Sequence, residues 1–186
     1  MQPLCAVSPS CAAIRAFDGF SYVWTCNNPQ DAPDDVRLDP QVVLVQRESD
    51  LYLRAIASCE YLVNNSGFPY YFIRREGQKY LATWHPAPLK TLGKRQKYKF
   101  FDHKRTQRNF LQATHIISPN PHTTQVYLDD YDLRGVYAGR LGETGYPRID
   151  RTLSLDAGRR REILQKLGLS GQRRVVFYAP TARHPQ

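Results

Sequence analysis

The stretch "VVLVQRESDLYLRAIASCEYLVN", residues 42–64, contains a strand, a helix and a second strand in immediate succession. Its first five residues form a short apolar run rich in valine, which is typical of a buried strand. The segment "SDLYLRAIASC" has the pattern of a helix, with Ser49 or Asp50 as its N-cap. The segment "YLVN" has the pattern of the next strand. Because strands that alternate with helices usually pair in parallel, the stretch predicts an α/β layer architecture with a mostly parallel sheet.

The alternation of short apolar runs and polar helical segments continues on both sides of this stretch. An earlier strand is predicted at "FSYVWT", residues 20–25, and later strands at residues 70–73, 80–84, 115–118 and 174–178. One further helix is expected to begin after Asn120, which caps it, with Pro121 in the first helical position. A last helix, "DAGRRREILQKLGL", is expected to end at Gly168. Its apolar stripe consists of Ile163, Leu164 and Leu167.

These patterns divide the chain into three parts. Residues 1–41 are rich in Pro, Asp, Asn and Cys and form a poorly defined N-terminal segment. Residues 42–156 are expected to form an α/β domain. Residues 157–186 are expected to supply a linker helix and the first strand of another domain. Because a single strand cannot form a sheet, we expect the sequence to stop inside that domain.

Composition limits the class of protein. The chain has 186 residues, of which 41% are hydrophobic, and this is compatible with a globular core. No apolar run approaches the roughly 20 residues that cross a bilayer, and the first residues lack the pattern of a signal peptide. The four cysteines show no CxxC spacing, so free thiols are expected and neither a metal nor a cofactor is predicted.

The net charge of +9 is unevenly distributed. Residues 1–41 contain two basic and five acidic residues, which gives −3 and leaves +12 for the remainder of the chain. This excess favours phosphate-rich partners, which include nucleic acid, an anionic membrane surface and a phosphorylated substrate. A solvated basic face without a specific partner is the other interpretation.

His85 is the main candidate for chemistry. It follows the predicted strand at residues 80–84 directly, and the carboxyl ends of strands are where open α/β sheets bind ligands. Pro86 and Pro88 restrict the backbone of its loop. With a pKa near about 6.5, a histidine can accept a proton from a hydroxyl. Nearby, Lys90 offers a point charge for a phosphate. The alternative is a loop histidine that only hydrogen-bonds the backbone.

A block of positive charge follows, with eight Lys or Arg against one acid between residues 90 and 108 and with aromatic residues interleaved. Such a block can pair with nucleic acid phosphates and stack on bases, or lie on an anionic bilayer. A solvated loop is also compatible with it. The residues predicted to contact phosphate or membrane are Lys94, Arg95, Lys97, Lys99, Lys104 and Arg105.

Weaker candidates lie after two other strands. Asn65 and Ser66 follow the strand at residues 61–64, where such residues either present donors to a ligand or only make a turn. Pro121 and His122 lie at the start of a predicted helix, where His122 faces a ligand or serves only in the local turn. The familiar nucleotide, hydrolase and zinc-protease motifs do not occur in the sequence.

Several stretches together resemble the CDP-glycerol glycerophosphotransferases that prime and polymerise teichoic acids. They are "YLVNNSGFPYYFIRREGQKYLATWHPAPLKTLGK", "FLQATHIISPNPHTT", "GYPRID" and "VVFYAPTAR", in the order of the family. The resemblance implies a GT-B type fold of two Rossmann-like domains, with residues 42–156 on the acceptor side and the donor site in the second domain. It also implies transfer of glycerol phosphate from CDP-glycerol to a hydroxyl of a lipid-linked polyol phosphate acceptor.

By this resemblance His85 corresponds to the family's catalytic base, and "GYPRID" adds Arg148 to the expected substrate-binding residues. That set is Asn65, Ser66, Lys90, Pro121, His122 and Arg148. The resemblance further implies a cytoplasmic enzyme that is peripheral on the inner face of the cell membrane. Nucleic acid is not an expected partner of such an enzyme.

The sequence departs from the family in two respects. Pro86 and Ala87 replace the usual glycine and threonine after the histidine, which removes a backbone donor and limits φ. The expected second domain is also incomplete, so the chain as given is expected to be inactive. The alternatives are a non-catalytic basic module that binds anionic lipid or nucleic acid, and a different GT-B transferase.

Overall fold

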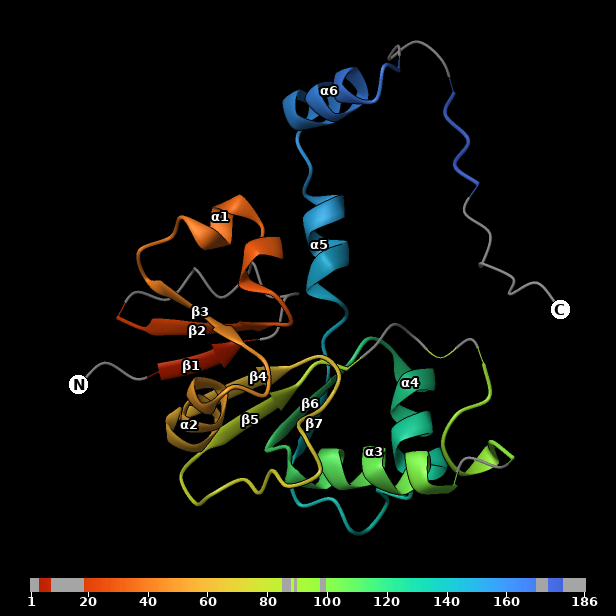
Figure 1. Cartoon of the computed structure of the whole chain (residues 1–186). Coiled ribbons are helices and arrows are strands. Elements are labelled where there is room, and N and C mark those ends of the chain that lie inside the picture. The colour runs from red at the N-terminus through yellow and green to blue at the C-terminus, as the bar shows by residue number, and fades with distance from the viewer. Residues whose placement is uncertain are drawn as a thin grey trace, which may run out of the picture. The chain divides into compact units, whose positions relative to one another are not determined.

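The computed structural model describes residues 4–7, 19–84, 88, 90–97, 100–169 and 174–178. These fall into two compact units, Met1–Tyr146 and Pro147–Gln186. The first unit is an α/β domain, and Figure 1 shows its strands side by side with helices against them. The second unit contributes two helices to the described residues, α5 (Pro147–Leu153) and α6 (Ala157–Lys166).

The described strands of the first unit form one sheet in the order β3-β2-β1-β4-β5-β6-β7, and all neighbouring pairs are parallel. From β1 the chain adds strands in one direction, and from β4 it adds them in the other. The predicted parallel α/β architecture is thus confirmed, with its topological switch between β1 and β4. The strands are β1 (Leu4–Val7), β2 (Ser21–Cys26), β3 (Val42–Gln46), β4 (Tyr61–Asn64), β5 (Lys79–Ala82), β6 (His115–Ser118) and β7 (Arg140–Glu143).

Helices α2 and α4 begin where the sequence places capping residues. Ser49 Oγ accepts a hydrogen bond from the Tyr52 N–H at 3.2 Å at the start of α2, and Asn120 Oδ1 accepts from the Thr123 N–H at 2.9 Å at the start of α4. Both predicted N-caps are confirmed. The helical elements are η2 (Pro29–Asp31), α1 (Asp34–Arg37), α2 (Asp50–Ser58), η3 (Gly93–Arg95), α3 (Phe100–Gln112), α4 (Pro121–Gln125) and the π-helix η4 (Val126–Asp130).

The side chains of the strands point alternately to the two faces of the sheet and form two separate hydrophobic clusters. Val23 belongs to the larger one, whereas its neighbours Tyr22 and Trp24 belong to the smaller one, because successive side chains of a strand point to opposite faces of the sheet. The larger cluster packs strand residues such as Leu62 and Ile116 against α2, α3 and η4. It includes Ala82 and Trp84 at the carboxyl end of β5, where the candidate site begins.

Segment 1–41, in which the sequence indicates one strand, supplies both β1 and β2 to the sheet. Four isolated residues such as Leu4–Val7 carry too little pattern to be recognised without their neighbours. The strand predicted at residues 80–84 ends at Ala82, and Trp84 has a left-handed backbone, with φ of 46°.

One predicted strand is wrong, and another is not paired within the described residues. Residues 70–73 form a turn, in which the Phe72 N–H donates to Pro69 O at 3.0 Å. The carbonyl of Phe72 accepts from the side chains of Arg108 and Gln112 on α3, at 2.9 and 2.8 Å, in place of a neighbouring strand. Residues 174–178 are not paired in a strand either, and all five are exposed. An apolar run becomes a strand only where the fold offers it a partner.

The second unit confirms the helix predicted near its start. Asp156 caps α6, since its Oδ1 accepts from the Arg159 N–H at 2.8 Å, and Gly168 has the left-handed φ of 66° that was expected after the helix. The apolar stripe, however, is solvent-exposed at Ile163 and Leu167 within the part of the chain that the structure describes.

Candidate functional site

The carboxyl ends of β4, β5 and β6 lie next to one another at one edge of the sheet. Asn64 pairs with Ala82, and Ala82 pairs with Ile116 in the next strand. The Thr83 N–H donates to Asn64 O at 3.0 Å, so the pairing continues to the strand ends. Three loops therefore leave the sheet together, after Asn64, Ala82 and Ser118. This edge is where an open α/β sheet binds ligands.

The loop after β4 is shaped by Asn64. Its Oδ1 accepts from the backbone N–H groups of Ser66 and Gly67, at 2.9 and 3.1 Å, and makes an Asx turn. Helix α3 holds the loop from the other side, because Asn109 Oδ1 accepts from the Phe68 N–H at 2.8 Å. Of the predicted binding residues here, Asn65 is half-buried and Ser66 is exposed.

The tight turn at Asn64 was therefore expected, whereas Asn109 was missed as an organising residue. The signal for Asn64 was present in the sequence, because an asparagine that ends a strand before Ser and Gly is typical of a turn. Asn109 gave no local signal, since its partner Phe68 is 41 residues away along the chain.

The loop after β5 starts from a tightly packed tryptophan. Trp84 is 5% exposed, and its ring centroid lies 5.3 Å from that of Phe110, 5.1 Å from Tyr127 and 5.4 Å from Tyr131. His85, predicted as the catalytic base, follows it immediately and lies outside the described residues. Lys90, predicted to bind phosphate, is exposed.

The loop after β6 leads into α4. Pro121 is the first residue of this helix and His122 the second, and both are exposed. Thr124 Oγ1 donates to Glu143 Oε1 at 2.6 Å, which ties the helix to the end of β7. Arg148 is the second residue of α5 and belongs to the second unit. The structure thus brings Asn65, Ser66, Pro121 and His122 to the carboxyl edge of the sheet.

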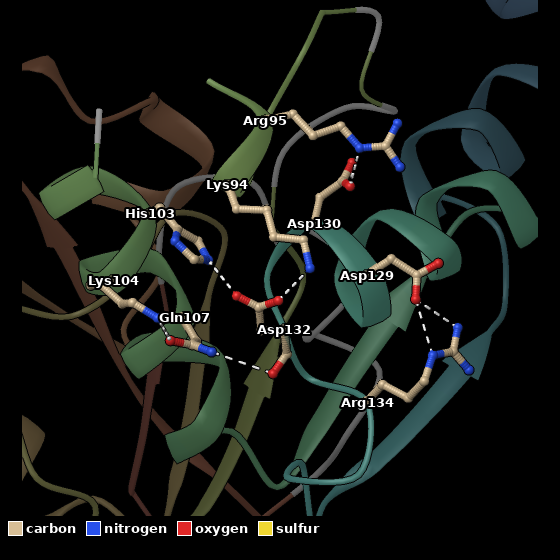
Figure 2. Close-up of polar contacts among 9 residues, drawn as sticks. All are labelled: Lys94, Arg95, His103, Lys104, Gln107, Asp129, Asp130, Asp132 and Arg134. Carbon is tan, nitrogen blue, oxygen red and sulfur yellow. Dashed lines mark hydrogen bonds and ion pairs between the residues drawn. The ribbon is translucent and has the colours of Figure 1, made fainter. Parts of the chain in front are cut away.

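The basic block is not a uniform face of unpaired cations. Lys94 Nζ lies 2.5 Å from Asp132 Oδ1, and Arg95 Nε lies 2.6 Å from Asp130 Oδ1 (Figure 2). Carboxylates at these short distances offset part of the positive charge that Lys94 and Arg95 present to a ligand. Lys97, Lys104 and Arg105 are exposed, while Lys99 lies outside the described residues.

The ion pairs and burial shift the pKa values of two neighbouring groups. The hydrogen bond from Lys94 lowers the pKa of Asp132, and the charges of Lys94, His103 and Lys104 lower it further. His103 on α3 is 4% exposed, and burial lowers its pKa, as does Lys104. Its Nε2 lies 3.4 Å from Asp132 Oδ2. His103 is therefore a buried imidazole beside a carboxylate, and burial lowers its pKa.

The cysteines that the structure describes with side chains, Cys26 and Cys59, are free thiols. Burial raises the pKa of Cys59 to about 11, so it is not a reactive thiolate. Within the described ranges, His, Cys, Asp and Glu do not gather into a group that could hold a metal ion. Across the same residues, helices long and apolar enough to cross a membrane are also absent.

The sequence matches, over residues 10–186, the family described as CDP-Glycerol:Poly(glycerophosphate) glycerophosphotransferase. The chain belongs to this family. It is 30% identical to a teichoic acid poly(glycerol phosphate) polymerase of Staphylococcus epidermidis, over 91% of this chain and 24% of that protein. The corresponding polymerase of Bacillus subtilis is 29% identical, over 90% of this chain and 22% of its own. The family member described here thus spans about a quarter of the length of these curated relatives.

Solved structures of the wall teichoic acid polymerase TagF have the same fold. A variant of TagF superimposes with a TM-score of 0.79 and 22% identity, over 98% of this chain and 48% of the TagF chain. The same TagF variant, soaked with CDPG, gives a TM-score of 0.79 and 25% identity. This likeness confirms the predicted fold class of the domain, an α/β fold with a Rossmann-like parallel sheet.

Proposed function

We propose that this chain carries the acceptor-side half of an enzyme that transfers glycerol phosphate from CDP-glycerol to a hydroxyl of a lipid-linked acceptor in teichoic acid synthesis. The observation that carries the proposal is the carboxyl edge of β4, β5 and β6, from which three loops leave together. One of these loops contains His85, in a chain that belongs to the glycerophosphotransferase family.

In the proposed reaction His85 acts as general base. The acceptor hydroxyl gives its proton to the imidazole while its oxygen forms a bond to the phosphorus of the glycerol phosphate group. The bond from that phosphorus to the CMP oxygen breaks, and CMP leaves with the electron pair. Lys90 is assigned to a phosphate of the acceptor or the donor, because an exposed ammonium is a compact charge for such a group. Asn65, Ser66, Pro121, His122 and Arg148 are proposed to line the substrates.

The exposed cations of the basic block are proposed to contact acceptor phosphates and the inner face of the cell membrane. They are Lys90, Lys97, Lys104 and Arg105. Attraction of this kind to anionic headgroups would hold the protein on the membrane surface, and we propose that it is a cytoplasmic protein at the inner face of the membrane. The ion pairs of Lys94 and Arg95 favour a smaller contribution from these two side chains.

We further propose that the 186 residues alone do not turn over the donor, because they cover 48% of the TagF chain with which they superimpose. Transfer requires donor and acceptor to be held in line, and orientation of that kind supplies roughly 7–11 kcal/mol of a barrier. A second complete domain is proposed to bind CDP-glycerol.

The test is CMP release from CDP-glycerol with a lipid-linked acceptor. The 186-residue chain is compared with a version extended by the remaining portion of the TagF fold, and with the same version carrying His85→Ala. We expect release only from the extended version, and a loss of at least about a hundredfold on His85→Ala. His115→Ala is the matched control, because His115 is exposed at the amino end of β6. Turnover by the short chain contradicts the need for a second domain, and unchanged turnover by His85→Ala contradicts the role of His85.

A further inference from the structure

The loop that carries His85 and Lys90 is anchored at both ends to the same short piece of chain, residues 126–132. We call these residues the clamp; they comprise η4 (Val126–Asp130) together with Tyr131 and Asp132. The contacts lie at Trp84, where the loop begins, and at Gly93 to Arg95, where it ends.

At its start the loop leaves β5 through a strained residue. A bulky residue rarely adopts a positive φ, and such a conformation costs about 1–3 kcal/mol, so it persists only where its surroundings impose it. Trp84 has φ of 46°, and its indole packs against Tyr127 and Tyr131 of the clamp and against Phe110 of α3. This packing holds Trp84 in that conformation at the start of the loop.

At its end the loop meets the backbone of the clamp. A Cβ on Gly93 would lie 2.1 Å from Asp130 O, so only glycine allows this approach. The next two residues add the ion pairs of Lys94 with Asp132 and Arg95 with Asp130 (Figure 2).

The clamp is itself held in place by the core and by α3. Tyr127 is 1% exposed and Tyr131 is 5% exposed. Gln107 Nε2 donates to Asp132 O at 3.3 Å, and His103 lies against the carboxylate of Asp132. Asp132 has φ of 50°, so a second non-glycine residue in this arrangement is in the left-handed region. Strained residues of this kind gather at functional sites, where a fixed geometry is needed.

We infer that the clamp positions the two ends of this loop, Trp84 and the segment from Gly93 to Arg95, so that Asp130, Asp132, Lys94 and Arg95 are positioning residues. In this arrangement Lys94 and Arg95 orient the loop, in place of the phosphate contacts predicted from the sequence. The link to catalysis rests on the proposed function, whereas the anchoring of the loop does not.

The test combines amide hydrogen exchange of residues 90–96 in the 186-residue chain with CMP release by the extended version, for Lys94→Met, Asp132→Asn and the double variant. We expect the amide hydrogens of residues 90–96 to exchange about three- to tenfold faster in each single variant, because the ion pair that joins this segment to the clamp contributes to its local stability. The double variant is expected to exchange no faster than the singles, since they remove the same contact. In the extended version both single variants should lower kcat and leave KM for the acceptor nearly unchanged.

Asp129→Asn is the matched control, because Asp129 is on the same π-helix but pairs with Arg134, at 2.8 Å, and not with the loop. Trp84→Ala and Trp84→Phe form an independent pair: the first should lower kcat, and the second, which retains a ring against Tyr127, should restore most of it.

If the amide exchange rates of residues 90–96 are unchanged in Asp132→Asn, the clamp does not anchor this segment and the inference is wrong. Faster exchange with unchanged kcat would overturn its role in positioning. A rise in KM for Lys94→Met alone would show that Lys94 is a phosphate ligand and would also overturn the inference. If the wild-type extended version releases no CMP, the proposed function fails, and the exchange rates still decide whether the clamp exists.

Discussion

Gly93→Ala tests the close approach between the loop and the clamp. The added Cβ would lie 2.1 Å from the carbonyl oxygen of Asp130 and 2.6 Å from its carbonyl carbon. Both are backbone atoms of a packed π-helix, so they cannot rotate away as a flexible side chain would. The φ of 61° adds a second cost, about 1–2 kcal/mol for a residue with a Cβ. Overpacking adds about 1–3 kcal/mol, which gives a loss of about 2–5 kcal/mol in the free energy of unfolding.

Gly135→Ala separates these two costs. Gly135 has a similar φ, 76°, but a Cβ placed on it meets nothing within 4 Å. The Gly135→Ala variant should therefore lose only about 1–2 kcal/mol in the free energy of unfolding, which is the cost of the positive φ for a residue with a Cβ. Urea unfolding followed by tryptophan fluorescence gives both losses. If the loop detaches to avoid the clash, the global loss will be smaller, and trypsin will cut faster after Lys90 and Lys94 in Gly93→Ala than in Gly135→Ala.

The reasoning is refuted by one combined result. If both variants lose the same free energy within about 0.5 kcal/mol, and trypsin cuts both at the wild-type rate, then Gly93 does not lie against Asp130 in solution.

Two further predictions concern charge. Burial lowers the pKa of His103 in the folded chain, so as the pH falls the imidazole is protonated in the unfolded chain before it is protonated in the folded chain. The contribution of His103 to the free energy of unfolding should therefore be fully present above about pH 6.5 and should decrease as the pH falls below that value. Urea unfolding at pH 7 and pH 5 should show a smaller fall for His103→Gln than for the exposed-site control His115→Gln, and equal falls would contradict this account. The chain should also bind anionic vesicles less at about 0.5 M than at about 0.1 M salt, and removing Lys90 and Lys97 together should weaken binding more than removing Arg95, whose charge Asp130 offsets. Co-sedimentation measures this, and equal binding to neutral vesicles would contradict it.

Much of the fold was predictable because its signals are local. Ser49 and Asn120 cap helices through backbone groups three residues away, and Pro121 is suited to the first helical turn wherever that turn lies. The strands β3, β4 and β6 are apolar runs bounded by polar residues, which a reader of the sequence can recognise. Strand β1 was missed for the opposite reason, since four residues have no pattern of their own and gain their identity from pairing with β2 and β4.

The site was predictable only as a set of loops. Parallel strands bring their carboxyl ends to one edge, so the sequence order of strands and polar residues predicted that the segments after β4, β5 and β6 would meet. Which lysines and arginines form ion pairs within the chain was not predictable, because the partner of Lys94 lies 38 residues further along the chain. A count of lysines and arginines cannot show which of them already have a carboxylate.

The sequence by itself determined the parallel α/β class, the starts of α2, α4 and α6, the position of His85 after a predicted strand and the family to which the chain belongs. Only the tertiary structure decided that Trp84 is held in a left-handed conformation by Tyr127 and Tyr131, and that Lys94 and Arg95 fasten the loop to the clamp. The physical reason is the distance along the chain that separates the interacting residues. Capping and strand pattern depend on neighbours along the chain, whereas aromatic packing and ion pairing depend on residues that only folding brings together.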